Sequence, residues 1–479
     1  MGKPVNDKHV LVIPFPAQGH MIPLLDLTQQ LAISGLTITI LVTPKNLPIL
    51  SPLLASHSSI QTLLLPFPSH PSIPAGAENT KDMPATSFFT MMPVLGQLHD
   101  PLVHWFNTHP SPPCAVISDI FLGWTHRLAT ELGVRRFVFS PSGAFALSII
   151  YSLWREMPKR TNHDNQTEVI SFPKLPNAPK FNWRSVSTIY QSYVEGDPDS
   201  EFVKQGFWDD MASWGLVINT FTELEKVYLD HLRAELGHDR IWGVGPLHLL
   251  ADESSSEPKQ RGGASSVSVP ELMTWLDSCE DRKVVYICFG SQAVLTNSQM
   301  AALASALEKS RVRFVWSVKN PTRGTGNSDK DGVIPVGFEN RVEDRGRVIK
   351  GWAPQVSILN HRAVGAFLTH CGWNSVFEAV VAGVPMLAWP MRADQFSNAT
   401  LLVDYFKVAT KVCEGPQTVP DSTELARHFV ELLSENRVER EKAMELRNAA
   451  VKAIKDGGSS ARDLEKLVQQ IEELEIQSN

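Results

Sequence analysis

The stretch from Trp352 to Gln395 constrains the fold of this chain more than any other. It contains a short apolar run, Ala363 to Leu368, of the kind that forms a buried strand. The run ends in Thr-His-Cys-Gly-Trp-Asn-Ser, and residues 376–381 that follow are compatible with a helix. A strand, a glycine-containing turn and a helix in succession direct free backbone N–H groups at an anion. The stretch therefore predicts a phosphate site in an α/β domain.

Polar side chains surround the predicted turn. Asn374 and Ser375 are residue types that cap helices, and their side chains offer donors to the same phosphate. Glu378 lies one helical turn beyond Ser375, a suitable place for a carboxylate that accepts from ribose hydroxyls. After a second expected strand, residues 384–389, a polar loop offers groups suited to a sugar: Arg392, Asp394 and Gln395. Together these residues predict a nucleotide-sugar site.

The same stretch resembles the signature box of plant UDP-dependent glycosyltransferases of family 1, from its opening Trp-Ala-Pro-Gln to its closing Asp-Gln. The resemblance extends from His9 to the C-terminal helix and is greatest to the subgroup that glucosylates flavonols and hydroxybenzoates. It implies the α/β GT-B fold, in which two doubly wound Rossmann-like domains face a central cleft. It also implies an inverting transfer of glucose from UDP-glucose to a hydroxyl of a small phenolic acceptor in plant secondary metabolism.

The resemblance assigns donor contacts to Gly19, Ser291, Trp352, Ala353, Gln355, His370, Trp373, Asn374, Ser375, Glu378, Asp394 and Gln395. In the family, the tryptophan at position 352 stacks on uracil, and Gln355 and Glu378 contact the ribose. The diphosphate is held by the residues at 370, 374 and 375 and by the Gly-Ser turn at 290–291. The last two residues of the box, 394 and 395, hold the sugar.

Two further residues are candidates for the chemistry of transfer, which needs a base to take the proton of the attacking hydroxyl. His20 follows the first expected strand, where it either acts as the base or merely caps the helix that begins at Met21. The preceding Pro-Ala-Gln-Gly resembles the family's catalytic loop, which implies the base. Asp119 follows the expected strand 114–118 and is either a helix N-cap or, by resemblance, the partner that stabilises the His20 imidazolium.

A chain of 479 residues predicts two domains, and alternating strands and helices predict parallel, doubly wound sheets. We expect an acceptor-binding domain at 1–245 and a UDP-sugar-binding domain at 270–456. Between them, residues 246–269 are rich in Ser, Gly and Pro and predict a linker. Residues 457–479 predict a helix with one apolar stripe, and the resemblance implies that this helix packs back on the first domain.

Composition excludes several classes of partner. A net charge of −7 argues against nucleic acid and anionic membranes, and no apolar run is long enough to span a bilayer. The polar start, residues 1–8, leaves no room for a signal peptide. Five scattered cysteines without a C-x-x-C pair favour reduced thiols. We therefore expect a cytoplasmic enzyme, without membrane insertion, that acts as a monomer.

A metal ion or other cofactor is not expected. Asp197-Pro198-Asp199 has the spelling of a divalent-metal motif, but a proline at its centre suits a loop. A helix N-terminus together with His370 is able to neutralise the leaving diphosphate without an ion.

The sequence constrains the identity of the acceptor and of the donor sugar less than it constrains the class of reaction. Apolar residues that suit a flat aromatic acceptor, or equally the core, are Phe88, Phe89, Met91, Met92, Phe121, Phe145, Tyr190 and Tyr193. Pro141 stands where many relatives carry a threonine that contacts the sugar, so Ser140 or Ser142 would have to replace it. Three alternatives stay open: another UDP-sugar such as rhamnose or xylose, a non-phenolic acceptor, or a non-catalytic nucleotide-sugar-binding protein. The absence of G-x-G-x-x-G after the first strand argues against an oxidoreductase.

Overall fold

The computed structural model describes residues 8–83, 87–162, 164–250, 265–319 and 331–475. The chain divides into two compact units: an N-terminal unit of Met1–Ser254 with Lys452–Asn479, and a C-terminal unit of Ser255–Val451. The start of the predicted linker is helical, because Leu247–Leu250 forms α10 and Leu247 is buried in the core of the N-terminal unit. Residues 251–264 of that linker lie outside the described residues.

The N-terminal unit is built on seven parallel strands in the order β3-β2-β1-β4-β5-β8-β9. Their bounds are β1 His9–Ile13, β2 Thr37–Val42, β3 Ile60–Leu64, β4 Ala115–Asp119, β5 Arg135–Ser140, β8 Gly215–Ile218 and β9 Ile241–Gly243. The strand order reverses between β1 and β4, where Ile13 and Ser118 are register partners. In such sheets ligands bind at the carboxyl ends of the strands beside this switch point.

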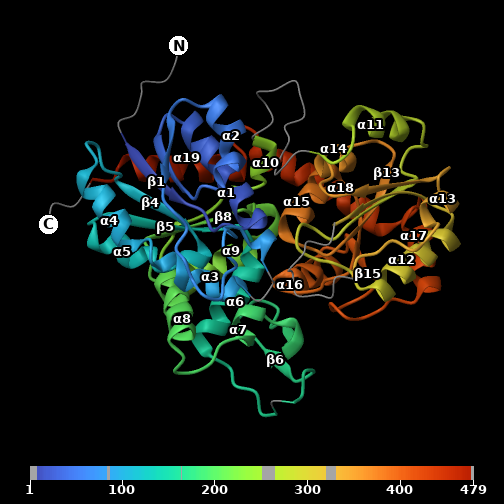
Figure 1. Cartoon of the computed structure of the whole chain (residues 1–479), viewed down its shortest axis with the longest axis horizontal. Helices are drawn as coiled ribbons and strands as arrows, with labels where there is room; N and C mark the ends of the chain where they lie inside the picture. The colour runs from blue at the N-terminus through green and yellow to red at the C-terminus, as the bar shows by residue number, and fades with distance from the viewer. Residues whose placement is uncertain (1–7, 84–86, 163, 251–264, 320–330, 476–479) are drawn as a thin grey trace. The chain divides into compact units, whose positions relative to one another are not determined.

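Helices cover both faces of this sheet (Figure 1). They are α1 Gln18–Ile33, α2 Leu47–Ser56, α3 Ser87–Gly96, α4 His99–Thr108, α5 Thr125–Glu131, α6 Ala144–Glu156, α7 Thr188–Gln191, α8 Pro198–Met211, α9 Thr222–Leu236, α10 and α19 Ser459–Glu472. A short antiparallel pair, β6 (Val169–Ser171) and β7 (Lys180–Asn182), is separate from the main sheet. One core cluster joins the strands to α1, α2, α10 and α19 through buried aliphatic side chains.

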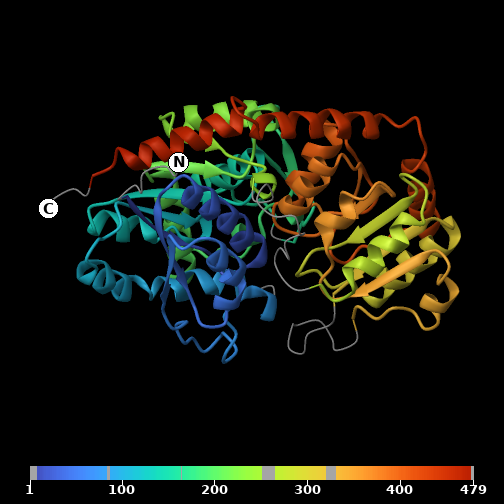
Figure 2. The ribbon, with the colours of Figure 1, turned by 90° about the horizontal axis from the view of Figure 1, so that it is seen from above.

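The last helix, α19, packs on the N-terminal unit although it comes from the far end of the chain (Figure 2). Leu467, Val468 and Ile471 are buried in the same core as β1, which the amphipathic stripe of the sequence explains. Its first turn is tied to the chain after β9, since Ser460 Oγ donates to the carbonyl of Gly245 over 2.6 Å.

The C-terminal unit contains six parallel strands in the order β12-β11-β10-β13-β14-β15. Their bounds are β10 Val284–Cys288, β11 Arg313–Val318, β12 Gly346–Lys350, β13 Val364–Thr369, β14 Met386–Ala388 and β15 Ala409–Lys411. Its helices are α11 Val269–Asp277, α12 Asn297–Ser310, α13 Phe338–Arg341, α14 Gln355–Leu359, α15 Trp373–Ala382, α16 Gln395–Thr400, η4 Leu401–Tyr405, α17 Ser422–Leu432 and α18 Val438–Ile454. Here the order reverses between β10 and β13, where Cys288 pairs with Thr369. The predicted α/β class, with two doubly wound sheets, is confirmed.

Candidate active site

His20 and Asp119 meet at the switch point of the N-terminal sheet. His20 lies in the first turn of α1, which begins at Gln18 and not at Met21, and Asp119 is the last residue of β4. Nδ1 of His20 lies 2.9 Å from Oδ2 of Asp119, whose side chain has no exposed surface. Because an ionised carboxylate only accepts hydrogen bonds, Nδ1 carries the proton and Nε2 is left to act as a base.

The two carboxylate oxygens of Asp119 make different contacts. Oδ1 accepts from the backbone N–H of Phe121 at 2.9 Å and so caps the short 3-10 helix η2 (Ile120–Leu122), while Oδ2 serves His20. The two oxygens therefore have separate partners, and the cap fixes the carboxylate that faces the imidazole.

Three phenylalanine rings surround the His20 imidazole. Ring centroids lie 4.6 Å away for Phe121, 5.5 Å for Phe15 and 6.5 Å for Phe88. Phe88 and Phe121 are among the predicted acceptor-lining residues, whereas sequence reasoning missed Phe15. Its position two residues after the end of β1, at the carboxyl edge of the sheet, was the available signal. The rings give the base an apolar, aromatic neighbourhood.

The other predicted acceptor-lining residues lie elsewhere. Met91 and Met92 are buried in α3. Phe145 packs on Tyr228 with centroids 4.6 Å apart. The rings of Tyr190 and Tyr193 lie 5.2 and 5.8 Å from that of Trp154. Phe89 is half-buried, and no described ring contact joins any of these residues to His20.

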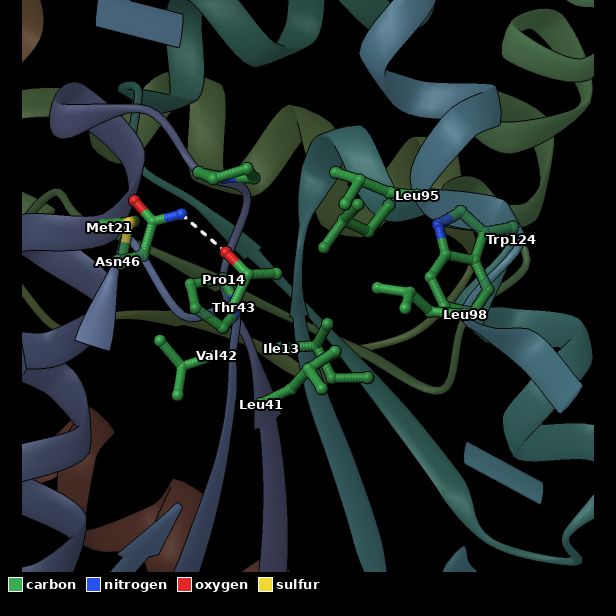
Figure 3. A pocket seen from close by; sticks show the side chains of 12 residues that line it. Ile13, Pro14, Met21, Leu41, Val42, Thr43, Asn46, Leu95, Leu98 and Trp124 are labelled. Carbon is green, nitrogen blue, oxygen red and sulfur yellow. Dashed lines mark hydrogen bonds between the residues drawn. The ribbon is translucent and has the colours of Figure 1, made fainter. Parts of the chain in front are cut away.

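An apolar pocket opens in the same unit beside the ends of β1 and β2 (Figure 3). Its wall includes Pro16 and Met21, which flank His20 in the chain, together with Leu95 and Trp124. The indole Nε1 of Trp124 is buried and has no hydrogen-bond partner among the described residues. The pocket therefore presents a largely apolar surface next to the turn that carries His20.

The buried side chain of Arg136 forms hydrogen bonds to the end of β4. Arg136 donates from Nε to Ser118 Oγ at 2.8 Å and from Nη2 to the carbonyls of Asp119 and Leu122 at 3.5 and 3.3 Å. The carboxyl group of Asp210 lies beside it, with the Nη1 and Oδ1 atoms 2.7 Å apart and both side chains fully buried. Burial raises the pKa of Asp210 to about 8, although Arg136 acts in the opposite direction. No sequence pattern indicates this network, because its members lie far apart in the chain.

The predicted phosphate turn is present after β13. Helix α15 begins at Trp373 with Gly372 as its N-cap, and no side chain caps it. The expectation that Asn374 or Ser375 caps this helix was wrong, since both lie inside its first turn. The first-turn N–H groups of α15 nevertheless remain the anion-binding feature that the pattern predicts.

The ring of His370 is enclosed by two glycines. A Cβ atom on either Gly290 or Gly372 would lie 2.6 Å from its Nε2 atom. Burial, with the positive charge of Arg392 as a smaller cause, lowers the pKa of His370 to about 4. The imidazole is therefore neutral at neutral pH, and it offers one N–H donor and no charge. Ser291, partly exposed, follows Gly290 at the end of β10.

The predicted ribose residues are in contact with one another. Gln355, the first residue of α14, donates from Nε2 to Glu378 Oε2 at 2.6 Å and to Ser375 Oγ at 3.0 Å. A carboxylate and an amide are thus held together at the start of α15, where they suit a vicinal pair of hydroxyls.

The two tryptophans assigned to the donor differ in exposure. Trp352 is partly exposed, and its backbone N–H donates to Ser266 Oγ at 2.7 Å. Trp373 is buried and packs on Phe377 with ring centroids 4.9 Å apart. Trp352 is therefore partly accessible to a ligand, whereas Trp373 belongs to the core. Ala353 is buried.

The predicted sugar residues lie where the loop after β14 leads into α16. Asp394 is the N-cap residue of α16, and its Oδ2 accepts from Asn398 Nδ2 at 3.0 Å. Gln395 begins the helix, and its Oε1 accepts from the backbone N–H groups of Met391 and Arg392, each at 3.0 Å. Gly19 is exposed in α1 of the N-terminal unit, so it lies in the unit of His20 and not with the other predicted donor residues.

The metal-like motif has a structural explanation. Asp197 caps α8 by accepting from Ser200 N–H at 2.9 Å, and Pro198 occupies the first helical position. Within the described ranges, no group of three His, Cys, Asp or Glu side chains has the arrangement of a metal site. In the same part of the chain, we find no helix that has both the length and the apolar character to cross a membrane. All five cysteines are free thiols.

A hydrogen-bonded His–Asp pair at one switch point and a glycine-containing turn before a helix at another lie where α/β sheets carry their ligand sites. The family profile described as UDP-glucoronosyl and UDP-glucosyl transferase matches residues 265–447. UDP-glycosyltransferase 89B2 of Stevia rebaudiana is 59% identical over 97% of this chain and 99% of its own. Flavonol 3-O-glucosyltransferase UGT89B1 of Arabidopsis thaliana is 56% identical over 97% of this chain and 96% of its own.

A solved structure extends the likeness to three dimensions. The crystal structure of Arabidopsis thaliana UGT89C1 complexed with UDP-L-rhamnose superposes with a TM-score of 0.79 at 40% identity, covering 97% of this chain and 98% of the other. The chain therefore belongs to the plant family 1 UDP-dependent glycosyltransferases. It is a glycosyltransferase with the GT-B fold.

Proposed function

We propose that this enzyme transfers glucose from UDP-glucose to a hydroxyl group of a small phenolic acceptor, with inversion at the anomeric carbon. The observation that carries the proposal is the 2.9 Å contact between His20 and the buried Asp119, enclosed by aromatic rings at the switch point. A flavonol is the named acceptor of one relative, the Arabidopsis enzyme that is 56% identical, which supports the phenolic class.

The roles of the residues follow from their contacts. Nε2 of His20 takes the proton of the acceptor hydroxyl as the oxygen bonds to the anomeric carbon and the bond to the UDP oxygen breaks. Asp119 stabilises the imidazolium that forms. The leaving diphosphate gains its negative charge where the N-terminus of α15 and the neutral His370 donate hydrogen bonds. A single displacement of this kind inverts the configuration.

In this proposal the two units bind different substrates. The N-terminal unit binds the acceptor through the aromatic rings around His20, and the C-terminal unit binds the UDP-sugar through residues 352–395. No metal ion takes part. We also propose that the enzyme is cytoplasmic, because free cysteines suit a reducing compartment. We further propose that it is a monomer. Light scattering on the purified chain tests the monomer.

One experiment tests the reaction. The purified enzyme is incubated with UDP-glucose, UDP-rhamnose or UDP-xylose and a panel of flavonols, hydroxybenzoates and aliphatic alcohols, and the products are identified by mass spectrometry and NMR. We expect β-glucosides of phenols from UDP-glucose. Rhamnosides as the main product would favour the second candidate, which is supported by the UDP-L-rhamnose complex of UGT89C1. No product from any pair, with UDP still bound, would favour a binding protein.

A further inference from the structure

The side chain of Gln355 is held at both ends of its amide. The hydroxyl of Tyr286, in β10, donates to Oε1 of Gln355 at 3.1 Å. The Nε2 atom of the same amide donates to Oε2 of Glu378 at 2.6 Å. A continuous series of hydrogen bonds therefore runs from the middle of the sheet through α14 to α15.

Tyr286 is built into the core and acts as a donor. It has no exposed surface, and its ring stacks on Phe367 of β13 with centroids 5.0 Å apart and planes inclined by 16°. Burial, with smaller effects from Cys288 and the negative charge of Glu378, raises the pKa of the Tyr286 hydroxyl well above its ordinary value. The phenol therefore keeps its proton, and its position is fixed by the sheet.

The orientation of the Gln355 amide follows from its two partners. If the amide were turned over, its carbonyl oxygen would lie against the carboxylate of Glu378, and two acceptors would face each other. With the carbonyl on Tyr286, the NH2 group meets both Glu378 and Ser375. The carboxylate of Glu378 thus sets the orientation of the amide, and the Tyr286 hydroxyl, by donating to the carbonyl oxygen, holds the amide at the distance at which its NH2 group reaches Glu378.

We propose that Tyr286 is a positioning residue for the ribose of the UDP-sugar, acting through Gln355 on Glu378 without touching the ligand. The inference rests on the proposed function, in which Gln355 and Glu378 recognise the ribose hydroxyls. Nothing in the sequence singles out Tyr286, because it lies in an apolar strand and reads as core.

The test combines one variant with two ligands. Tyr286→Phe removes only the hydroxyl and keeps the ring that stacks on Phe367, so the variant is expected to fold. The Kd values of UDP and of 2′,3′-dideoxy-UDP are measured by calorimetry for both proteins. We expect Tyr286→Phe to weaken UDP about tenfold, since a buried carbonyl loses its donor, and to weaken the dideoxy ligand less than twofold. With UDP-glucose, KM should rise by a similar factor while kcat stays the same.

A matched control removes another buried tyrosine hydroxyl. Tyr228 in α9 accepts from Asn177 Nδ2 at 3.2 Å, and Tyr228→Phe should leave both Kd values unchanged. Equal losses for the two ligands would mean a purely structural role and would overturn the proposal, as would no loss at all. If the wild-type enzyme does not distinguish the two ligands, the ribose assignment fails, and the inference fails with it. Turnover of UDP-glucose by the wild type then shows that the proposed function stands.

Discussion

Nδ1 of His20 lies 2.9 Å from Oδ2 of Asp119, although 99 positions separate the two residues in the chain. The contact exists because β1 and β4 are neighbours in the sheet and both end at the same edge. The first turn of α1 then carries His20 over the end of β4. A pair formed in this way depends on the sheet topology, which places the ends of β1 and β4 side by side.

Replacing His20 by alanine removes the base but no group that contacts uridine in our proposal. We expect kcat/KM to fall by roughly 10²- to 10⁴-fold, while the Kd of UDP stays within about twofold. Steady-state kinetics and calorimetry measure the two effects. His104→Ala, at an exposed histidine of α4, is the control and should have wild-type kinetics. Asp119→Asn should also be severe, and wild-type turnover in that variant would remove Asp119 from the mechanism.

The local part of this site was predictable, and the part formed by distant segments was not. The strand–turn–helix at 364–382 follows from residues that are adjacent in the sequence. Where the helix begins was not predictable, because Gly372, Asn374 and Ser375 are all residue types found at helix N-caps. Tyr286 and Arg136 gave no signal, since strands of a parallel sheet that is covered on both faces show no polar alternation.

Gly372→Ala tests the packing around His370. The new Cβ would lie 2.6 Å from Nε2 of His370, so the ring must move away from the phosphate turn. We expect the Kd of UDP to rise by roughly tenfold, with little change in the thermal midpoint. Gly206→Ala is the matched control, because its Cβ would meet nothing closer than 3.7 Å. Equal affinities in the two variants would contradict the proposed contact between His370 and the diphosphate.

The low pKa of His370 predicts a pH dependence of stability. The folded-state value is about 4 and the ordinary value is 6.5, so the unfolded chain binds the extra proton between these limits. Above pH 6.5 the neutral His370 ring makes its full contribution to the free energy of unfolding. As the pH falls toward 4, the free energy of unfolding decreases by about 2 to 3 kcal/mol. Thermal midpoints of the ligand-free enzyme from pH 7.5 to 4.5 should fall less steeply in His370→Gln. Parallel curves for the two proteins would contradict this origin.

Substituting Asp197 distinguishes a structural role of this residue from a metal-binding role. Because its carboxylate caps α8, Asp197→Ala should cost about 1 kcal/mol of stability and leave kcat/KM unchanged. Activity of the wild type should survive EDTA. Asp199→Ala removes no helix cap, so it should lower the stability less than Asp197→Ala does. It should likewise leave kcat/KM unchanged. Loss of turnover in EDTA that manganese or magnesium restores would disprove metal independence.

The contacts of Gln395 refine the expectation for the donor sugar. A primary amide generally offers both a donor and an acceptor, but here Oε1 is engaged by the N–H groups of Met391 and Arg392. In our proposal the NH2 group is therefore the part of Gln395 that binds the sugar, and Asp394 supplies the acceptor. We propose that this pair matches neighbouring equatorial hydroxyls of glucose. A sugar with an inverted or missing hydroxyl would leave a hydrogen bond unmade, which costs about 1 to 3 kcal/mol.

UDP-glucose should accordingly exceed UDP-galactose and UDP-rhamnose in kcat/KM by roughly ten- to a hundredfold. Gln395→Glu is the sharpest variant, because it keeps an oxygen for Met391 and Arg392 and replaces only the NH2 donor. It should lose most of the preference for glucose, whereas the Kd of UDP changes little. Gln395→His should narrow or reverse the preference. Because Pro141 has no side-chain donor, we expect the pair at 394 and 395 to contribute most of this preference. Equal or higher kcat/KM for UDP-rhamnose or UDP-xylose in the wild type would refute glucose as the donor sugar, while the His20 chemistry would stand.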